Sequence, residues 1–278
     1  MSALVSQAEK AARFQALHGR PGAFVVPNPW DAGSARILAS LGFEALATTS
    51  GGLAVTLGLR DGAVTREQAL AHVVQVAAAT NLPVTADLEN GYGDAPESVA
   101  ETLRLSAEAG VVGGSIEDAA GDGARRIYDL SHAIERIQAA VAVARSLPIP
   151  FVLTARAENF LRGRPDLDDT IRRLQAFEAA GADVLYAPNL PDLASIRLVC
   201  SAVTKPVNVI IGAPGRCFPV AALAEAGVRR ISVGPALLQT AITAMVHAAK
   251  DIRTHGSFEF AEQALSFSDL NRLMAGSG

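Results

Sequence analysis

The sequence predicts a single (β/α)8 barrel, and three observations support this fold class: the size, the alternation of segments and the glycines between them. The chain has 278 residues, 50% of them apolar, which suits one large domain, because barrels of this class commonly reach about 250 residues. Short β-rich apolar runs alternate with Ala-rich stretches of helical period, as expected for a parallel sheet covered by helices. Helix-like stretches often end at a glycine before the next strand, as in SLGFEAL and EAGVRRI, which fits helix C-caps.

The predicted elements follow one another in eight strand–helix units. The strand candidates are apolar runs at residues 23–26, 45–49, 84–87, 114–117, 151–156, 184–187, 207–210 and 231–233. The helix candidates have the helical spacing of apolar residues and lie at 31–41, 65–80, 95–109, 131–146, 168–180, 192–203, 219–226 and 235–250. The runner-up, an open doubly wound sheet, usually has a Gly-rich first turn, whereas VPNPWDAGSA contains no G-x-G-x-x-G. We therefore expect a barrel over residues 1–250 and a C-terminal extension of two short amphipathic helices over 251–278.

Composition excludes several function classes. With 24 Lys+Arg against 28 Asp+Glu and no basic run, the chain is not expected to bind nucleic acid. No window approaches the roughly 18 apolar residues of a membrane span, and the charged start MSALVSQAEKAARF does not fit a signal peptide. Cys200 and Cys217 form no disulfide framework. We expect a reduced, cytoplasmic protein without nucleic-acid or membrane partners.

Polar residues gather at the carboxyl ends of the predicted strands, where barrel enzymes place their chemistry. In chain order they are Ser50, Gly51, Gly52, Arg60, Asp61, Asp87, Glu89, Asn90, Glu117, Asp118, Arg156, Glu158, Asn189 and Asn208. So many carboxylates at one end would repel one another without a cation, and oxygen ligands favour Mg²⁺ or Mn²⁺. None of the five histidines falls at a strand end, which argues against a His-ligated zinc site. Arg156 offers a planar fork for a substrate carboxylate, and the amides of the SGG segment offer an anion site.

Each of these residues also has an ordinary structural interpretation. Asp87 and Glu89 would serve equally well as loop acids, because acids are common in turns. Arg156 would alternatively be the structural ion-pair partner of Glu117 or Glu158. Cys217 follows the seventh strand, but no histidine neighbours it in sequence to activate a thiolate, so it is not assigned a catalytic role.

Together the motifs resemble the isocitrate lyase / phosphoenolpyruvate mutase superfamily over essentially residues 13–250. The matching segments, in family order, are VVPNPWDAGSARI, TTSGGLAVTLGLRD, VTADLENGYGD, GGSIEDA and LTARAENF. The resemblance implies a barrel whose last helix is swapped between protomers, usually in dimers of dimers. It further implies Mg²⁺ and a small 2-oxo acid substrate, with a C–C or C–P bond made or broken next to the carbonyl.

The resemblance also assigns residues. Ser50, Gly51 and Gly52 would cradle the substrate carboxylate or phosphonate, and Asn208 would contact the substrate. Asp61, Asp87, Glu89 and Glu117 would form the acidic magnesium shell, with Asp87 the most direct ligand and Glu89 in place of the usual aspartate. Arg156 would clamp the carboxylate or the developing enolate, and we expect Arg156, Glu117 and Asp61 to take part in catalysis.

One departure from the superfamily bears on the reaction. Lyases of the isocitrate type carry K-[KR]-C-G-H in a loop after strand four, and the mutases carry a Lys and an Asn there, whereas residues 119–129 read AAGDGARRIYD. We therefore expect a Mg²⁺-dependent lyase that cleaves a C–C bond next to the carbonyl of a small 2-oxo or 2-hydroxy di- or tricarboxylate, with oxaloacetate decarboxylation as one outcome. A C–P bond enzyme acting on phosphonopyruvate and a 2-oxo acid binding protein of weak activity remain as alternatives.

Overall fold

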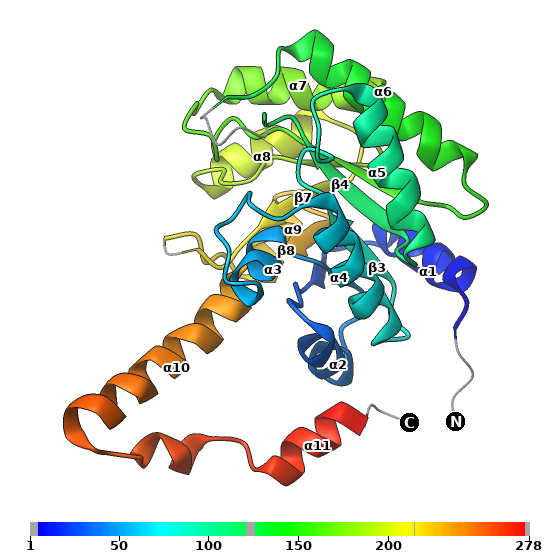
Figure 1. Ribbon diagram of the computed structural model, residues 1–278. Coiled ribbons are helices and arrows are strands. Elements are labelled where there is room, and N and C mark those ends of the chain that lie inside the picture. Colours follow the sequence, from blue (N-terminus) through cyan, green and yellow to red (C-terminus); the bar gives the residue numbers. More distant parts are fainter. Residues whose placement is uncertain (1–4, 121–125, 214, 276–278) are drawn as a thin grey trace.

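The computed structural model describes residues 5–120, 126–213 and 215–275, and it confirms the barrel (Figure 1). Parallel strands pair in the order β1-β8-β7-β6-β5-β4-β3-β2, and the Ala47 amide donates to the Pro27 carbonyl at 3.1 Å across the remaining seam. The strands are β1 (Phe24–Val26), β2 (Leu46–Ala47), β3 (Val84–Asp87), β4 (Gly113–Glu117), β5 (Val152–Arg156), β6 (Val184–Tyr186), β7 (Val207–Ile210) and β8 (Arg230–Ser232). The second strand is shorter than predicted because Thr49 already caps the following helix.

Helices connect and cover the strands on the outside of the barrel. They are α1 (Gln7–Gly19), α2 (Ala32–Ser40), α3 (Ser50–Thr56), α4 (Arg66–Ala78), α5 (Pro96–Glu108), α6 (Leu130–Ser146), α7 (Leu167–Ala179), α8 (Leu193–Ala202), α9 (Val220–Glu225), α10 (Ala236–His255), the 3₁₀ turn η1 (Glu259–Gln263) and α11 (Phe267–Ala275). Side chains of Asp31, Thr65 and Asp192 accept amide hydrogens at the starts of α2, α4 and α8, which fixes where these helices begin. The sequence did not predict α1 or α3, and α10 runs to His255, beyond the expected residue 250.

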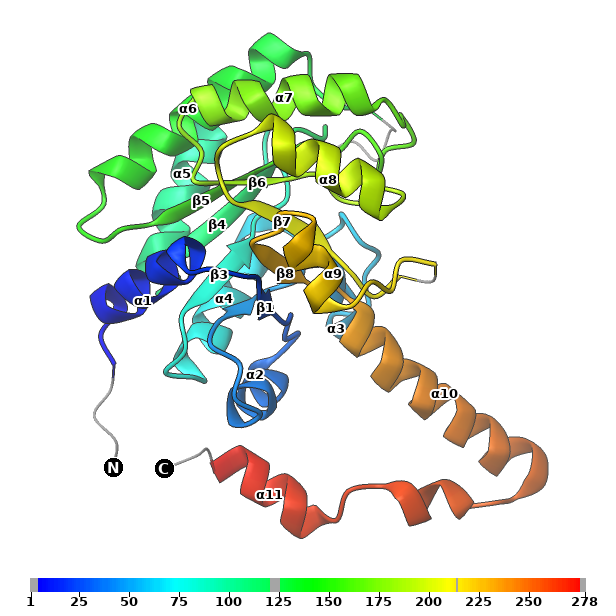
Figure 2. The same ribbon diagram turned by 180° about the vertical axis from the view of Figure 1, so that it is seen from behind.

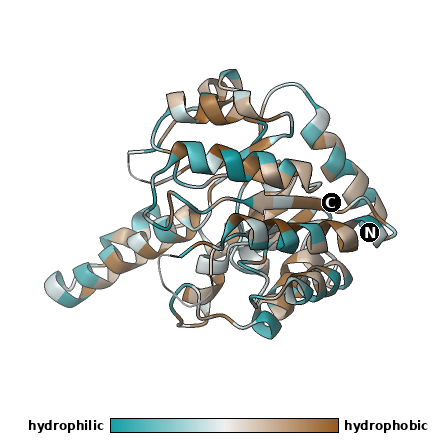
Figure 3. Cartoon of the chain, turned by 90° about the horizontal axis from the view of Figure 1, so that it is seen from above, coloured by the Kyte–Doolittle hydropathy of each residue, from teal (hydrophilic) through white to brown (hydrophobic). Residues whose placement is uncertain are grey.

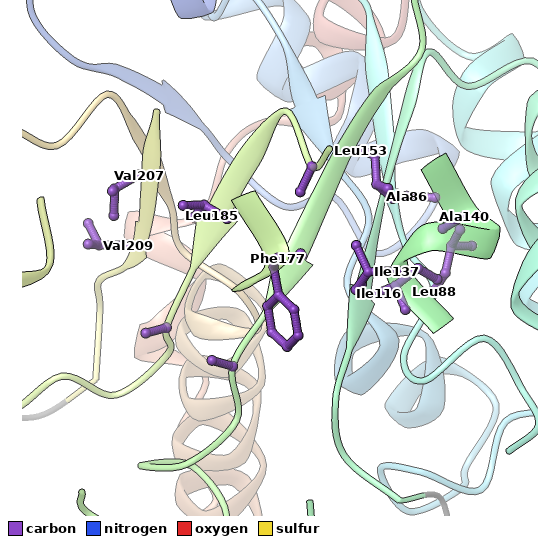
Figure 4. Close-up of a cluster of buried hydrophobic side chains, with 14 of the residues drawn as sticks. Ala86, Leu88, Ile116, Ile137, Ala140, Leu153, Phe177, Leu185, Val207 and Val209 are labelled. Atoms are coloured by element: carbon purple, nitrogen blue, oxygen red, sulfur yellow. The ribbon is translucent and has the colours of Figure 1, made fainter. Parts of the chain in front are cut away.

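The main apolar core lies between the strands and the surrounding helices (Figure 4). Ile116 and Leu153 point outward from β4 and β5 and are fully buried, and Ile137 and Phe177 meet this layer from α6 and α7. Residues alternate in direction along a strand, so the neighbours of these apolar residues point into the barrel. Helix packing thus orients Glu117 and Arg156 toward the interior.

Helix α1 closes the amino-terminal end of the barrel (Figure 2). Its Phe14, which is fully buried, joins Phe24, Val152 and Val184 in a second apolar cluster. Apolar side chains thereby fill this end, which leaves the opposite end, where the strands terminate, as the open one.

The C-terminal helices form an arm that extends from the barrel. Figures 1 and 3 show α10 extending outward, and Figure 1 shows the chain returning to place α11 beside α2. The Arg36 guanidinium donates to the Met274 carbonyl at 2.9 Å, which ties α11 to α2. Apolar side chains along the arm are exposed, including Met245, Phe258, Leu265 and, at 78% exposure, Phe267. Within the described ranges, no helix has the length and apolar character needed to cross a membrane.

Candidate active site

A cavity of about 290 Å³ opens at the carboxyl ends of the strands. The residues predicted from sequence that line it are Ser50, Gly51, Asp61, Asp87, Arg156, Asn189 and Asn208. Tyr186 and Arg230 also line it, and the sequence analysis singled out neither. Tyr186 is the last residue of β6 and Arg230 the first of β8, so their inward direction depends on strand register, which sequence patterns define poorly.

Arg156 contacts three carboxylates of the site. Its Nη1 donates to Asp87 Oδ1 at 2.9 Å, its Nη2 lies 3.2 Å from Glu117 Oε2, and its Nε donates to Glu158 Oε1 at 2.8 Å. The guanidinium carbon also lies 5.1 Å from the centre of the Tyr186 ring. The guanidinium thus pairs with Glu117 and Glu158, the structural role considered from sequence, and additionally with Asp87. Only 11% of the side chain is exposed, yet that part faces the cavity, so a ligand can reach it.

The SGG segment is the first turn of α3. Thr49 caps this helix, and its hydroxyl accepts the Gly52 amide at 3.3 Å. Both the Ser50 amide and the Ser50 hydroxyl donate to Asp87 Oδ2, at 3.1 and 2.8 Å. Gly51 lines the cavity, and its amide has no partner within α3 because it belongs to the first turn. Ser50 and Gly51 therefore face the cavity, whereas Gly52 is buried against Trp30, where a Cβ would lie 3.2 Å from Trp30 Cβ.

Several acidic residues around Arg156 have raised pKa values, because burial and the neighbouring carboxylates disfavour their ionised forms. Burial, followed by the charges of Asp87 and Glu117, raises the pKa of Glu89 to about 8. Burial also raises the pKa of Glu117 above its ordinary value, against the opposing effect of Arg156. The pKa of Asp61 is raised by burial and then by the charge of Asp87. Two guanidinium groups face these acids, Arg156 and Arg162, and Arg162 Nη2 lies 3.8 Å from Glu117 Oε1. They do not neutralise the carboxylates of Asp61, Asp87, Glu89, Glu117 and Glu158, and this excess of negative charge favours a bound cation.

These carboxylates suit an open magnesium site, in which water and substrate complete the coordination, better than a site closed by protein ligands alone. The Glu89 Oε1 atom is buried without a hydrogen-bond partner, and Glu89 holds a left-handed backbone with φ of 48°, a strained conformation that clusters at functional sites. Over the part of the chain that is described, no three Asp, Glu, His or Cys side chains converge as a ready metal site. Mg²⁺ is usually held by one or two carboxylates, with water and substrate oxygens completing the shell. Asp87, Glu89 and Glu117 are suited to that kind of coordination.

A buried network behind the site holds Glu158. The Glu158 amide donates to Asp118 Oδ1 at 2.8 Å, and Arg173 Nη1 donates to Asp118 Oδ2 at 3.0 Å. Burial raises the pKa of Asp118 to about 6, although both of these hydrogen bonds favour its charged form. Asp118 is only 3% exposed and does not line the cavity, so this predicted strand-end acid supports the backbone after β5.

The loop after β3 is held by a second buried arginine. Arg136, on α6, is 1% exposed and donates to the carbonyls of Asn90, Gly93 and Asp94. Its guanidinium carbon also lies 4.4 Å from the centre of the Tyr128 ring. This clamp fixes the loop that carries Glu89.

The remaining predicted residues have mixed placements. Asn208 lines the cavity, but its Oδ1 accepts from Arg230 at 2.8 Å and its Nδ2 donates to Ser232 Oγ at 3.1 Å. Cys217 is exposed, and its Sγ donates to the Ala213 carbonyl at 3.6 Å. Residues 121–125 of the loop after β4, including Arg125, lie outside the described residues.

Comparisons with known proteins support this fold and identify the family. The family model for phosphoenolpyruvate phosphomutase matches residues 14–253. A solved structure of a Burkholderia cenocepacia J2315 protein, described as a lyase/mutase, is 54% identical with a TM-score of 0.94 and covers 97% of both chains. Another from the same organism, described as a phosphonomutase, is 38% identical with a TM-score of 0.81 and covers 88% of this chain and 99% of its own. An oxaloacetate decarboxylase of Bradyrhizobium diazoefficiens is 31% identical over 84% of this chain and 81% of its own.

These matches define the chain as a (β/α)8-barrel enzyme of the isocitrate lyase / phosphoenolpyruvate mutase superfamily. Within it, the chain belongs to the phosphoenolpyruvate phosphomutase family, as the family match over residues 14–253 establishes.

Proposed function

We propose that this enzyme is a Mg²⁺-dependent lyase that cleaves the C–C bond next to the carbonyl of a small 2-oxo or 2-hydroxy di- or tricarboxylate, with oxaloacetate decarboxylation as the first candidate. The observation that carries the proposal is the pairing of Arg156 with Asp87 and Glu117 at the rim of a cavity that Ser50 also lines. Arg156 and Asp87 line this cavity, so a carboxylate-binding cation and one candidate magnesium ligand lie within reach of one small molecule, and Glu117 pairs with the same cation without lining the cavity.

The chemistry needed is stabilisation of negative charge. Cleavage next to the ketone leaves the electron pair on a pyruvate-type enolate, so groups that bind an oxyanion lower the barrier. Magnesium held directly by Asp87, and through water by Glu89 and Glu117, would supply Lewis-acid polarisation of the ketone.

The chain's own residues would bind and orient the 2-oxo acid. The Gly51 amide would donate to the substrate carboxylate, and the Ser50 hydroxyl, which donates to Asp87 Oδ2 in the ligand-free protein, would turn to donate to it as well. Arg156 would donate to the developing enolate oxygen, and a fixed donor of this kind typically accelerates reactions by about 10²–10³-fold. Asp61, whose pKa is raised by burial, would hold or release a proton at the rim.

C–P bond chemistry on phosphonopyruvate is the second candidate. The similarity to a structure described as a phosphonomutase favours it, with 38% identity over 88% of this chain. A phosphonate and a carboxylate would both bind the same cations in this cavity.

A substrate panel would test the proposal. Oxaloacetate, 2-methylisocitrate, isocitrate, 2,3-dimethylmalate and phosphonopyruvate would be incubated with the enzyme and Mg²⁺ and followed by ¹H and ³¹P NMR. We expect pyruvate from oxaloacetate above the metal-only blank, with loss of this release in excess EDTA. Conversion of phosphonopyruvate alone would favour the second candidate. Saturable binding of 2-oxo acids with no product from any compound would identify a binding protein instead.

We also propose that the enzyme assembles as a homo-oligomer through its C-terminal arm. The exposed apolar side chains of Met245, Phe258, Leu265 and Phe267 support this, because water-exposed apolar surface of this extent marks interaction sites. Light scattering of the full chain and of a chain ending after His255 would test it, and we expect the shorter chain to form smaller assemblies.

A further inference from the structure

A buried arginine lies on the floor of the cavity with neutral partners only. Arg230 is 4% exposed, yet it lines the same cavity as Ser50 and Asp87. Its Nε donates to Asn208 Oδ1 at 2.8 Å and its Nη2 donates to Thr154 Oγ1 at 2.8 Å. Across the described ranges, no carboxylate lies at ion-pair distance from this guanidinium.

The third neighbour, His18, adds no negative charge. Its Nδ1 lies 2.8 Å from the Phe14 carbonyl, which can only accept, so Nδ1 carries the hydrogen. Its Nε2 is then a lone-pair acceptor, 3.5 Å from Arg230 Nη1. Burial, and then the charge of Arg230, lower the pKa of His18 to about 3, so the ring is neutral at physiological pH.

An arginine in this setting costs free energy in the ligand-free protein. The effective penalty for burying an unpaired ion is several kcal/mol, and charged side chains are seldom fully buried without an opposite charge. Barrel interiors are usually filled by bulky branched side chains, which avoid this penalty. A buried cation that faces a cavity and lacks an acid is therefore a binding group for an anion from outside the chain.

The strand register places this cation below the candidate active site. In the backbone register of the sheet, Arg156 lies opposite Tyr186, Tyr186 opposite Asn208, and Asn208 opposite Arg230. These four residues form one row across β5, β6, β7 and β8. Thr154, which Arg230 contacts, lies two residues before Arg156 on the same face of β5, a spacing of about 6.6 Å. Below Arg230, Phe14, Phe24 and Val184 fill the barrel, so the cavity ends at its guanidinium.

We propose that Arg230 is a specificity-determining residue that receives a second anionic group of the substrate, carried beyond the ketone carbon. The inference rests on the proposed function and assigns the residue that recognises the far anionic end of the substrate, a carboxylate or a phosphonate. The first end is held at the rim by Ser50, Gly51 and Arg156, and the second meets Arg230 through hydrogen bonds of about 2.9 Å.

Ligands that differ only at the far end would test this proposal. Malate and 2-hydroxybutyrate have the same chain length, but malate ends in a carboxylate where 2-hydroxybutyrate ends in a methyl group, and 3-phosphonolactate supplies the phosphonate. Calorimetry with Mg²⁺ would compare their affinities for the wild type and for Arg230→Gln, with Arg229→Gln as the matched control. Arg229 is the adjacent residue and donates instead to the Arg20 and Gly22 carbonyls outside the barrel.

We expect the wild type and Arg229→Gln to prefer malate or 3-phosphonolactate over 2-hydroxybutyrate by about 10-fold or more, as one charge-assisted hydrogen bond implies. Arg230→Gln should abolish this preference while 2-hydroxybutyrate affinity changes by less than about 3-fold. Its ligand-free unfolding temperature should not fall, because an uncompensated buried charge is removed. A preference for 3-phosphonolactate alone would support Arg230 as the anion-binding residue. It would contradict the proposal that the substrate is a dicarboxylate.

With the wild type and the glutamine variant, either of two results would overturn the inference: no dianion preference in the wild type, or an unchanged preference in Arg230→Gln. Arg230→Lys keeps the charge and decides the question if the glutamine variant does not fold. The lysine variant should retain only part of the preference, because a point charge replaces the planar fork. A preference equal to that of the wild type in Arg230→Lys would also contradict the assignment.

Discussion

Replacing Arg156 by lysine should impair the enzyme strongly although the charge is kept. The guanidinium contacts Asp87, Glu117 and Glu158 through three different nitrogens, at 2.9, 3.2 and 2.8 Å. A lysine ammonium is a point charge and cannot span these three directions, so at least one contact is lost. A hydrogen bond to a charged group contributes about 1.5–3 kcal/mol, which corresponds to roughly 10–150-fold in kcat/KM.

The lost contact should also lower the stability of the ligand-free protein. At about 2–4 °C per kcal/mol for a large domain, the unfolding temperature should fall by roughly 3–12 °C. Arg145→Lys is the matched control, since Arg145 pairs with Asp183 at 2.6 Å but has 49% of its side chain exposed. An exposed pair contributes about 0–1 kcal/mol, so this variant should stay near the wild type. Scanning calorimetry and steady-state kinetics on the two variants would test both expectations. A kcat/KM for Arg156→Lys within about 3-fold of the wild type would refute the clamp and leave Arg156 as a structural ion-pair partner.

Three further predictions concern the metal, the acids and the thiol. Asp87→Ala should abolish Mg²⁺-dependent oxalate binding in calorimetry while leaving the fold intact, because strand-end residues support chemistry more than stability; unchanged metal affinity would contradict it. The pKa of Glu89 rises from its ordinary value of 4.5 to about 8 in the folded protein, so the folded state binds this proton more tightly than the unfolded state does. In EDTA the unfolding temperature should therefore fall as pH rises from about 4.5 to 8, and less steeply in Glu89→Gln. Equal slopes in the two proteins would show that Glu89 does not cause this dependence. Any isocitrate cleavage should be slow and should persist in Cys217→Ser, since Cys217 is exposed and its Sγ donates to a backbone carbonyl; robust turnover that collapses in this variant would show that Cys217 supplies the missing acid–base group.

The sequence predicted the barrel well because its signals are local. Apolar runs and helical periods repeat in every unit, and a glycine follows several of the helices. The barrel rule that chemistry lies at the carboxyl ends of the strands then points to the residues there. Asp87, Glu117 and Arg156 were found in this way, and the structure places both acids within hydrogen-bonding or ion-pair distance of Arg156.

The sequence did not predict the residues whose position depends on strand register or on packing between distant segments. Arg230 begins a strand, and only its inward direction and its contacts with Thr154 and His18 distinguish it from the adjacent Arg229. An arginine at an inward position of an otherwise apolar strand was the available signal, but one residue of register reverses that conclusion. Arg136 reads as an ordinary helix residue until the fold places it under the carbonyls of Asn90, Gly93 and Asp94.

A crystal structure with Mg²⁺ and oxalate would test the central claim most directly, because oxalate is a planar dianion similar in shape to the enolate of pyruvate. We predict a metal ion with Asp87 as a direct ligand, oxalate oxygens on that ion, and the other side of oxalate at Ser50 and Gly51. We also predict that Arg156 exchanges at least one of its carboxylate contacts for oxalate. A metal ion bound away from Asp87, or oxalate that leaves Arg156 and the start of α3 untouched, would contradict the proposed site and its lyase chemistry.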